Sequence, residues 1–202
     1  MTRHKVTLRQ EQSGRYVDAE LIERIDAALA KRAEDAWQTY VATAKVEALA
    51  ANRPFPVLEH THWEWERKVS ITERLLPYPT LGIECAGHVQ GLMLLETDGH
   101  FGQLPTQSGS PLVYVNILAT APWNLPGVTD PPRYRGVGTV LLSAAASMSV
   151  ELGFKGRLGL HSLPKSEEWY NRLGMTCLGS DPNKQGLKYY EMSPDQAQHL
   201  IR

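Results

Sequence analysis

The stretch that decides the fold is Arg133-Tyr134-Arg135-Gly136-Val137-Gly138-Thr139, followed at once by the apolar run Val140-Leu141-Leu142-Ser143-Ala144-Ala145-Ala146. Glycines have no Cβ and let a phosphate approach the backbone closely. The first N–H groups of a helix lack internal partners and lie at the positive end of the helix dipole. The pattern therefore predicts a basic glycine turn that opens an apolar helix and can bind phosphate, with Arg133 and Arg135 adding full charges. An ordinary turn before a core helix is the alternative.

Length and composition are those of a globular protein. With 202 residues the chain fits one domain, or one domain with a helical extension. A net charge of -1 gives no bulk field for nucleic acid or anionic membrane, so we expect neither partner. No apolar run approaches the ~20 residues that a membrane span requires. Cys85 and Cys177 lack metal or redox spacing, and the first residues lack the apolar core of a signal peptide, so we expect a cytoplasmic protein.

The N-terminal part is expected to be mainly helical. Residues 4–9 alternate weakly and predict a short first strand. Residues 18–51 carry apolar residues mostly at spacings of four, which predicts one long helix or two consecutive ones. Prolines within residues 52–56 end this pattern. Residues 63–76 favour a helix, although they fit alternation in part.

Short strands and helices are predicted for the rest of the chain. Residues 81–86 and 89–97 are apolar runs, and the Gly87-His88 link between them suits a hairpin turn. Residues 112–120 are nearly all apolar, which predicts a central strand buried on both faces. The further predicted elements are a loop at 98–111, a helix at 137–152, a strand at 156–161, a helix from Pro164 to Gly174, and strands at 175–178 and 187–192.

The predicted order is helices, three strands, helix, strand, helix and two strands. This order is typical of a mixed α/β or α+β domain built around one central sheet. Within that single domain we distinguish an N-terminal strand and helical part, residues 1–56, from a core, residues 57–202.

Three motifs in chain order make the sequence resemble the GNAT superfamily of N-acetyltransferases, which depend on acyl-coenzyme A. The first is Leu118-Ala119-Thr120-Ala121-Pro122, at the end of the buried strand. The second is Arg-x-x-Gly-x-Gly, in which Arg133, Gly136 and Gly138 open the long helix. The third is Trp169-Tyr170-Asn171-Arg172-Leu173-Gly174-Met175, which is similar to the family's aromatic-Tyr-x-x-x-Gly-Phe segment. The resemblance covers residues 112–192.

The resemblance implies both a fold and a coenzyme site. The fold would be a central, mostly antiparallel sheet with one splayed pair of strands and flanking helices. Acetyl-coenzyme A would be the cosubstrate, with its thioester admitted where the family's fourth and fifth strands splay apart. Its pyrophosphate would bind at Arg133, Arg135, Gly136, Val137, Gly138 and Thr139, and its pantetheine arm would pair with the strand edge at Leu118, Ala119 and Thr120.

The resemblance assigns an acid more readily than a base. The family's helix tyrosine, here Tyr170, lies near the thioester sulfur and can protonate the leaving thiolate. Many relatives carry a glutamate base on the fourth strand, whereas this sequence reads Tyr114-Val115-Asn116 there. His161 is our candidate base because imidazole titrates near neutral pH, and a structural histidine at a strand end is the alternative. Glu84 and Glu96 are weaker candidates for the base.

Other groupings indicate no metal and no second cofactor. His60 and His62 would share one face of a strand, but no nearby Cys or Asp completes a metal site, and we expect none. Trp63 and Trp65 favour core packing, with an acceptor pocket or a nucleic-acid platform as alternatives. The segment Gly136-Val137-Gly138 lacks the third glycine of a dinucleotide fingerprint.

The expected function is transfer of acetyl from acetyl-coenzyme A to a primary amine by direct attack in a ternary complex. The acceptor would be a small molecule or a peptide, and its pocket would involve residues 18–51, 60–76 and 98–111. One alternative is a non-catalytic acyl-coenzyme A binding or sensor module. Another is an enzyme that acts on a protein N-terminus, a lysine or a charged tRNA. The sequence leaves monomer and homodimer both open.

Overall fold

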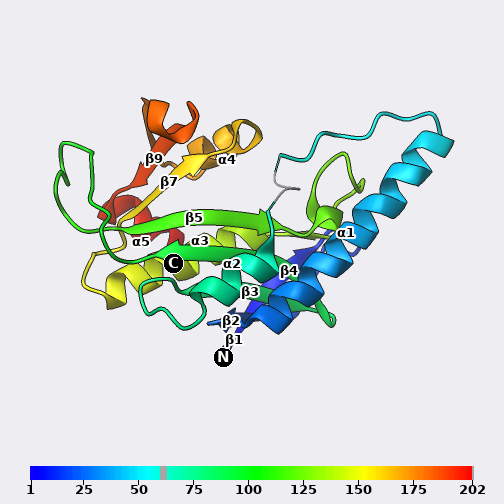
Figure 1. Ribbon diagram of the computed structural model, residues 1–202, viewed down its shortest axis with the longest axis horizontal. Coiled ribbons are helices and arrows are strands. Elements are labelled where there is room, and N and C mark those ends of the chain that lie inside the picture. Colours follow the sequence, from blue (N-terminus) through cyan, green and yellow to red (C-terminus); the bar gives the residue numbers. More distant parts are fainter. Residues whose placement is uncertain (60–62, 202) are drawn as a thin grey trace. The chain divides into compact units, whose positions relative to one another are not determined.

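The computed structural model describes residues 1–59 and 63–201, and Figure 1 gives the element labels used below, in which η marks a short 3-10 helix. In chain order the elements are β1 Thr2–Gln10, β2 Tyr16–Glu23, α1 Ala27–Ala50, α2 Trp65–Thr72, β3 Thr80–Cys85, β4 His88–Glu96, β5 Val113–Thr120, η1 Pro122–Asn124, β6 Tyr134–Arg135, α3 Val137–Glu151, β7 Leu158–Ser162, η2 Pro164–Ser166, α4 Glu167–Arg172, β8 Thr176–Ser180, η3 Pro182–Lys184, β9 Lys188–Met192 and α5 Pro194–Ile201.

The strands form a 9-stranded sheet in the order β6-β1-β2-β3-β4-β5-β7-β9-β8. Strands β5 and β7 pair in parallel, whereas β1 with β2, β2 with β3, β7 with β9 and β8 with β9 pair antiparallel. The expected mixed fold around one mostly antiparallel sheet is confirmed. The contacts of the chain gather into two units. Unit 1 comprises Met1–Leu76, Thr80–Met93 and Leu118–Leu141, and unit 2 comprises Pro77–Pro79, Leu94–Ile117 and Leu142–Arg202.

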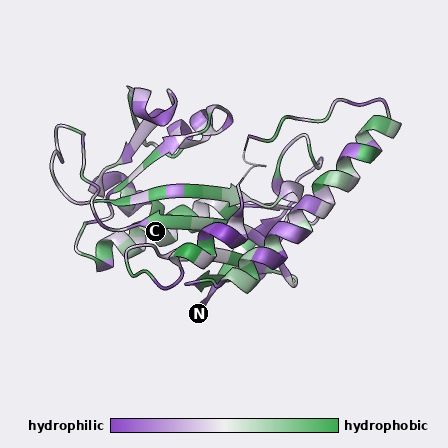
Figure 2. Cartoon of the chain, viewed as in Figure 1, coloured by the Kyte–Doolittle hydropathy of each residue, from purple (hydrophilic) through white to green (hydrophobic). Residues whose placement is uncertain are grey.

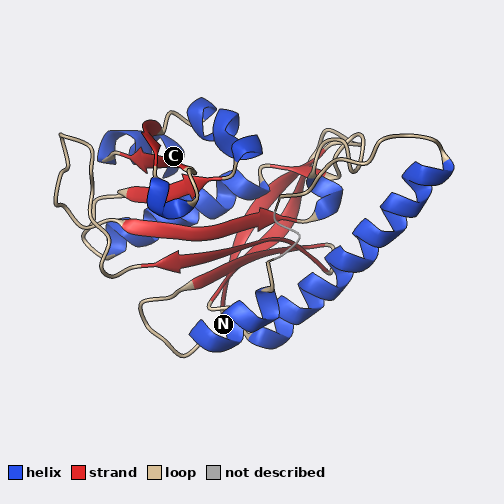
Figure 3. Cartoon of the chain, turned by 45° about the horizontal axis from the view of Figure 1, so that its top comes forward, coloured by secondary structure: helices blue, strands red, loops and turns tan. Residues whose placement is uncertain are grey.

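The long helix predicted for residues 18–51 is wrong at its start. Tyr16–Glu23 is strand β2, which pairs with β1 on one side and with β3 on the other. Buried Ala19 and Leu21 alternate with exposed acidic residues, as a half-buried strand requires. The helix begins only after Asp26, whose side chain accepts a hydrogen bond from the Leu29 N–H at 2.8 Å. Figure 3 shows α1 as one uninterrupted helix.

Three further predictions need smaller corrections. The helix expected at 63–76 is shorter, at Trp65–Thr72. The β3–β4 turn consists of Ala86 and Gly87, with φ values of 51° and 76°, because a two-residue hairpin turn of this kind needs positive φ at both positions. Helix α5 was not predicted at all. It begins with a capping box in which the Ser193 N–H donates to Gln196 Oε1 at 2.7 Å.

The predicted central strand at 112–120 is confirmed as β5. Val113, Tyr114 and Val115 are consecutive and all buried. Because neighbouring residues of a strand point to opposite faces, both faces are covered here. Figure 2 shows β5 mostly in the hydrophobic colour and α1 in mixed colours. In the described part of the chain, no helix combines the length and the apolar character needed to cross a bilayer.

Glu191 on β9 anchors the loop at residues 98–111, within unit 2. Its side chain is fully buried, at 0% exposure. The carboxylate accepts hydrogen bonds from the backbone N–H groups of Gln103 and Leu104 and from the Gln107 side-chain amide. Three donors converge on one buried carboxylate, so this loop has a fixed attachment to the sheet.

We expect the substitution Glu191→Gln to lower the free energy of unfolding by about 2 kcal/mol, because a carboxamide offers one acceptor oxygen to donors that face two. Urea unfolding of both proteins measures the difference. The matched control is Glu168→Gln, which removes an ion pair to Arg172 from a side chain that is 84% exposed. That change should be small, and an equally small change at Glu191 would rule out its anchoring role.

Candidate functional site

The glycine turn lies between β6 and α3 in unit 1. Gly136 has a φ of 91°, in the region that favours glycine, and a Cβ there would meet nothing within 4 Å. The Val140 N–H donates to the Gly136 carbonyl at 2.9 Å, at the start of α3. The N–H groups of Val137, Gly138 and Thr139 precede this bond at the open end of the helix. Such groups, with the helix dipole behind them, form an anion site.

The first turn of α3 packs directly on the backbone of β4. A Cβ added to Gly91 would lie 2.6 Å from Val137 Cγ1, 3.1 Å from Leu141 Cδ1 and 3.2 Å from the Ala119 carbonyl oxygen. Only a glycine at position 91 permits these contacts. The start of the helix is therefore held against β4 and the end of β5.

Gln90, the residue before Gly91, holds the segment that leads into the glycine turn. Its side chain is 1% exposed. Gln90 Oε1 accepts hydrogen bonds from Trp123 Nε1 at 2.8 Å and from Asn124 Nδ2 at 3.1 Å. Gln90 Nε2 donates to two carbonyls near the β3–β4 turn, each at 3.1 Å. The Tyr134 N–H in turn donates to Asn124 Oδ1 at 3.0 Å, so the chain entering the turn is fixed by hydrogen bonds.

The two arginines of the turn have different partners. The Arg133 guanidinium lies 5.2 Å from the ring centroid of Tyr40 and 5.3 Å from that of Trp123. These rings hold it by cation–π attraction and leave its net charge in place. Arg135 Nε pairs with Glu11 Oε2 at 2.6 Å, and the Arg135 side chain is 60% exposed. Arg133 is therefore held by two aromatic rings, whereas Arg135 is paired with a carboxylate.

Strands β5 and β7 pair over a short distance only. Their register covers Val113↔Leu158, Tyr114↔Gly159 and Val115↔Leu160. Strand β5 continues to Thr120 and β7 to Ser162. Leu118, Ala119 and Thr120 thus extend beyond the paired part of β5. Pairing that stops while both strands continue is the arrangement expected of a splayed strand pair.

His161 follows Leu160, the last residue of β7 that pairs with β5. Its Nδ1 lies 2.8 Å from the Tyr114 hydroxyl and its Nε2 lies 3.1 Å from Asp181 Oδ2. An ionised carboxylate only accepts, which assigns the imidazole proton to Nε2 and makes Nδ1 the acceptor for the tyrosine. The His161 side chain is 10% exposed. Burial lowers the pKa of His161, and Asp181 offsets this only in part, so the imidazole is neutral at neutral pH.

Tyr114 and Asp181 complete a chain of three hydrogen-bonded groups with His161. Burial raises the pKa of Tyr114 to about 12, so its hydroxyl keeps its proton. The Asn183 N–H donates to the carboxylate of Asp181 and lowers its pKa. The sequence reading missed Tyr114 and Asp181 as site residues, because neither lies in a motif.

Carboxylates reach β5 from other segments. Glu96 on β4 accepts a hydrogen bond from the Asn116 side chain and lies 2.7 Å from His100 Nε2. The His100 ring stacks on Tyr114, with centroids 4.5 Å apart and an interplanar angle of 12°. Glu84, the other carboxylate considered, pairs with Arg3 at 2.9 Å in unit 1. Of the two weaker candidates, Glu96 contacts the ring that stacks on Tyr114, and Glu84 belongs to unit 1.

Tyr170 lies in α4, in the same unit as His161, and is 6% exposed. Its ring packs against Trp169, at a centroid distance of 4.8 Å, and against Tyr190, at 5.7 Å. Burial raises the pKa of its hydroxyl well above the ordinary tyrosine value.

A metal site is not evident in the described part of the chain. Over residues 1–59 and 63–201, no three His, Cys, Asp or Glu side chains gather in a metal-binding group. The alternative considered at His60 and His62 lies outside the described residues.

Comparison with known proteins places the fold. No protein-family model matches the sequence, and no curated protein matches it. The chain is similar to the GNAT domain of S. lividans PAT, with a TM-score of 0.55 and 16% identity over 94% of this chain and 96% of that one. It is also similar to PaiA N-acetyltransferase from Thermoplasma acidophilum in complex with coenzyme A, with a TM-score of 0.54 and 13% identity over 88% and 99%. These likenesses show that the chain has the GNAT fold.

The environment of His161 predicts its titration. In the folded protein its pKa should lie below the ordinary 6.5, and the substitution Asp181→Asn should lower it further, because the carboxylate favours the imidazolium. Since the unfolded chain binds this proton first, the free energy of unfolding should fall as the pH drops from 6.5 towards the folded pKa. NMR titration of the imidazole signals, assigned with His161→Gln, measures both values.

The control for this titration is Asp195→Asn on α5, which should leave the His161 pKa unchanged. A wild-type pKa above 6.5 would show that Asp181, and not burial, dominates the site.

Proposed function

We propose that this GNAT-fold protein transfers an acetyl group from acetyl-coenzyme A to a primary amine, by direct attack in a ternary complex. The observation that carries the proposal is the turn at Gly136, where a positive φ, open space and the free end of α3 coincide. A coenzyme A pyrophosphate is an anion suited to such a turn. It would bind the backbone N–H groups of residues 135–139, with the Arg133 guanidinium close by in the chain.

The pantetheine arm would lie along the end of β5. Leu118, Ala119 and Thr120 continue past the part of β5 that pairs with β7. An extended chain with amide groups can add to such an edge as a further strand. The acyl thioester would then enter where β5 and β7 stop pairing, and the coenzyme would supply the reactive acyl group.

Tyr170 would assist the leaving thiolate. An ordinary thiol has a pKa of about 8.5, far below that of a buried tyrosine, so full proton transfer to sulfur is unfavourable. The hydroxyl instead stays protonated and donates a hydrogen bond to the developing negative charge, which is where such a donor stabilises a transition state. Solvent then supplies the proton that makes the free thiol.

His161 would be the base, acting through Tyr114. Both ring nitrogens of His161 are engaged, Nδ1 by Tyr114 and Nε2 by Asp181. As the amine nitrogen bonds to the carbonyl carbon, it passes a proton to the Tyr114 oxygen, and the tyrosine proton moves to Nδ1. The resulting imidazolium keeps its Nε2 proton and donates it in a hydrogen bond to the Asp181 carboxylate. The negative carboxylate stabilises the positive charge of the ring. Tyr114 is therefore the group that would touch the acceptor.

The acceptor side is assigned to the helical part of residues 1–56 and the segments around it. The absence of a carboxylate on β5 is the feature that favours the alternative of a non-catalytic sensor. Glu96 and Asp181 bring carboxylates to the neighbourhood of β5 and β7, which favours an enzyme. A sensor would bind acetyl-coenzyme A and release no thiol with any amine.

The coenzyme site is tested by the substitution Gly136→Val and calorimetric titration with acetyl-coenzyme A. We expect binding to weaken by roughly tenfold or more, because a β-branched residue disfavours a φ of 91° and its side chain would fill the space before the helix N–H groups. The matched control is Gly153→Val at the other end of α3. Gly153 has a φ of 80° and nothing within 4 Å of its Cβ position, so the strain is the same.

Equal losses in the two variants would assign the effect to strain alone. Absence of binding to the folded wild-type protein would end the transferase proposal.

The hydrogen-bond donor role of Tyr170 and the proton relay through Tyr114 are separated by Tyr170→Phe and Tyr114→Phe, with thiol release as the assay. Tyr170→Phe should lower kcat roughly 10- to 100-fold through the loss of one charge-assisted hydrogen bond. Tyr114→Phe should lower kcat/KM roughly 100-fold and abolish the acid limb of the pH profile, whose midpoint in the wild type reflects His161. Both variants should bind acetyl-coenzyme A as the wild type does. An unchanged acid limb in Tyr114→Phe would exclude the relay while leaving the coenzyme site intact.

A further inference from the structure

A tryptophan-lined pocket lies in unit 1, beside α1. It encloses about 270 Å³, and its walls include Trp37 of α1, Trp65 of α2 and Trp63 just before α2. Pro122 of η1 also lines it. That residue follows the end of β5, the edge assigned to pantetheine, by two positions in the chain. Through Pro122 the pocket therefore includes the chain that directly follows this strand edge.

The aromatic walls are fixed in place. Trp37 is 6% exposed and Trp65 is 2% exposed. Trp37 Nε1 donates to the Val89 carbonyl of β4 at 3.1 Å. The Trp37 and Trp65 rings meet edge to face at 6.5 Å and 82°, and those of Trp63 and Trp65 at 6.2 Å and 81°. A preformed wall of this kind costs little ordering entropy when an apolar ligand binds.

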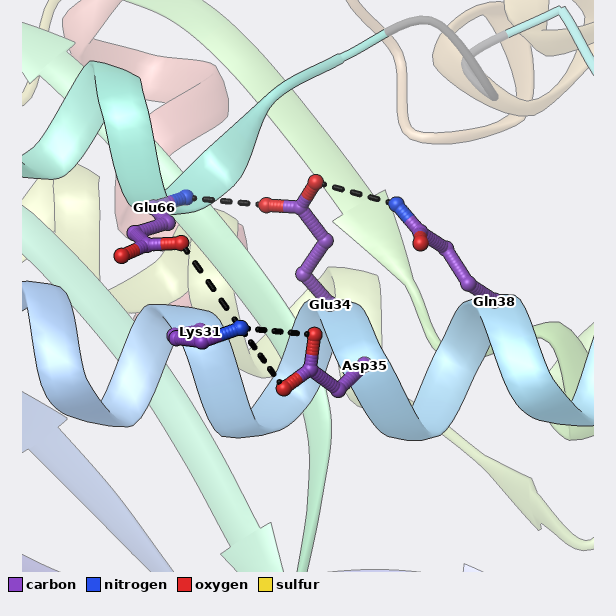
Figure 4. Close-up of polar contacts among 5 residues, drawn as sticks. All are labelled: Lys31, Glu34, Asp35, Gln38 and Glu66. Carbon is purple, nitrogen blue, oxygen red and sulfur yellow. Dashed lines mark hydrogen bonds and ion pairs between the residues drawn. The ribbon is translucent and has the colours of Figure 1, made fainter.

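One wall carries the carboxylate of Glu34. Glu34 accepts hydrogen bonds from the Glu66 N–H and from Gln38 Nε2, each at 3.0 Å. The neighbouring basic residue Lys31 pairs with Asp35 at 2.9 Å and with Glu66 at 3.9 Å, as Figure 4 shows. Among the residues that the structure describes, no ion pair reaches Glu34. The carboxylate is thus oriented by two neutral hydrogen-bond donors.

The far end of the pocket has the opposite charge. Lys45 lines it, about 16 Å from Glu34 along α1 at the rise of an α-helix. Lys45 Nζ lies 5.7 Å from the Phe55 ring centroid. A carboxylate at one end favours one positive group, and indole rings attract cations as well as apolar surface. The lysine at the other end disfavours a second positive charge, which argues against a polyamine.

We propose that this pocket selects the acceptor: a primary amine on an apolar, preferably aromatic, body with no second positive charge. The ammonium would lie at Glu34 and the apolar body against Trp37, Trp63 and Trp65. This inference rests on the proposed function, because it identifies the bound amine as the acyl acceptor. Before attack the ammonium would lose one proton to solvent, which leaves a neutral amine that is released from the ion pair with Glu34.

The test measures amine binding in the absence of coenzyme, with tryptophan fluorescence and calorimetry as the two readouts. The probes are 3-phenylpropylamine, 3-phenylpropan-1-ol, 3-phenylpropionate and spermidine, which separate the charge from the apolar body. The amine should bind at least roughly tenfold more tightly than each of the others. The substitution Glu34→Gln keeps an acceptor for the Glu66 N–H. It should weaken binding of the amine roughly tenfold and leave the affinity for the alcohol unchanged.

The matched control is Glu47→Gln, an exposed carboxylate of α1 that does not line the pocket. It should leave all four affinities as in the wild type. Equal binding of amine and alcohol, or equal effects of the two substitutions, would overturn the proposal. Thermal unfolding of both variants checks that α2 remains folded.

Acetylation is then measured with the amine that binds best. Because binding is read without acetyl-coenzyme A, failure of the coenzyme site does not affect this result. Binding of the amine at Glu34 without its acetylation, in a protein that binds acetyl-coenzyme A, would overturn the identification of this amine as the acceptor.

Discussion

The contact between α3 and Gly91 is the constraint on which the glycine turn and its helix depend. Val137 and Leu141 can reach the backbone of β4 only because position 91 has no Cβ. Successive residues of a strand point to opposite faces, so Gln90 is directed away from α3 and holds the η1 segment instead. Two consecutive residues of β4 therefore fix both the helix that offers its N–H groups and the chain that leads into it. The glycine turn needs little stabilisation of its own.

The features that sequence predicts well are those encoded within one short segment. The glycine turn with its helix and the buried strand β5 are each indicated by the residues of one short segment, and they lie where expected. Strand β2 does not, because its apolar residues fit a stripe of period four as well as alternation. Pairing with β1 and β3 decides in favour of the strand, and the Asp26 cap delays the helix. The capping box at Ser193 is a local sequence pattern that is typical of a helix start, and it could have predicted α5.

The group around His161 could not be read in this way. Tyr114, His161 and Asp181 come from β5, β7 and the residue before η3, and only the fold brings them within hydrogen-bond distance. Strand β5 carries no acidic residue, although the Glu96 carboxylate of β4 accepts a hydrogen bond from the Asn116 side chain within unit 2. Chemistry that one strand lacks can thus be assembled from side chains of several. Motifs therefore point to a local turn such as that at Gly136 far better than to a group assembled from distant segments.

The short strand β6 has a consequence for the order of folding. Its two residues pair with the end of β1, as Arg9↔Arg135 and Gln10↔Tyr134, although these positions lie far apart in the chain. Contacts between distant residues close late, because the loop entropy must be overcome before they form. On the ribosome, β1 emerges first and must wait for residues 134 and 135 before this pairing can form. The glycine turn is then among the last parts of unit 1 to form, and a ligand that bound there would stabilise only chains that have completed that step.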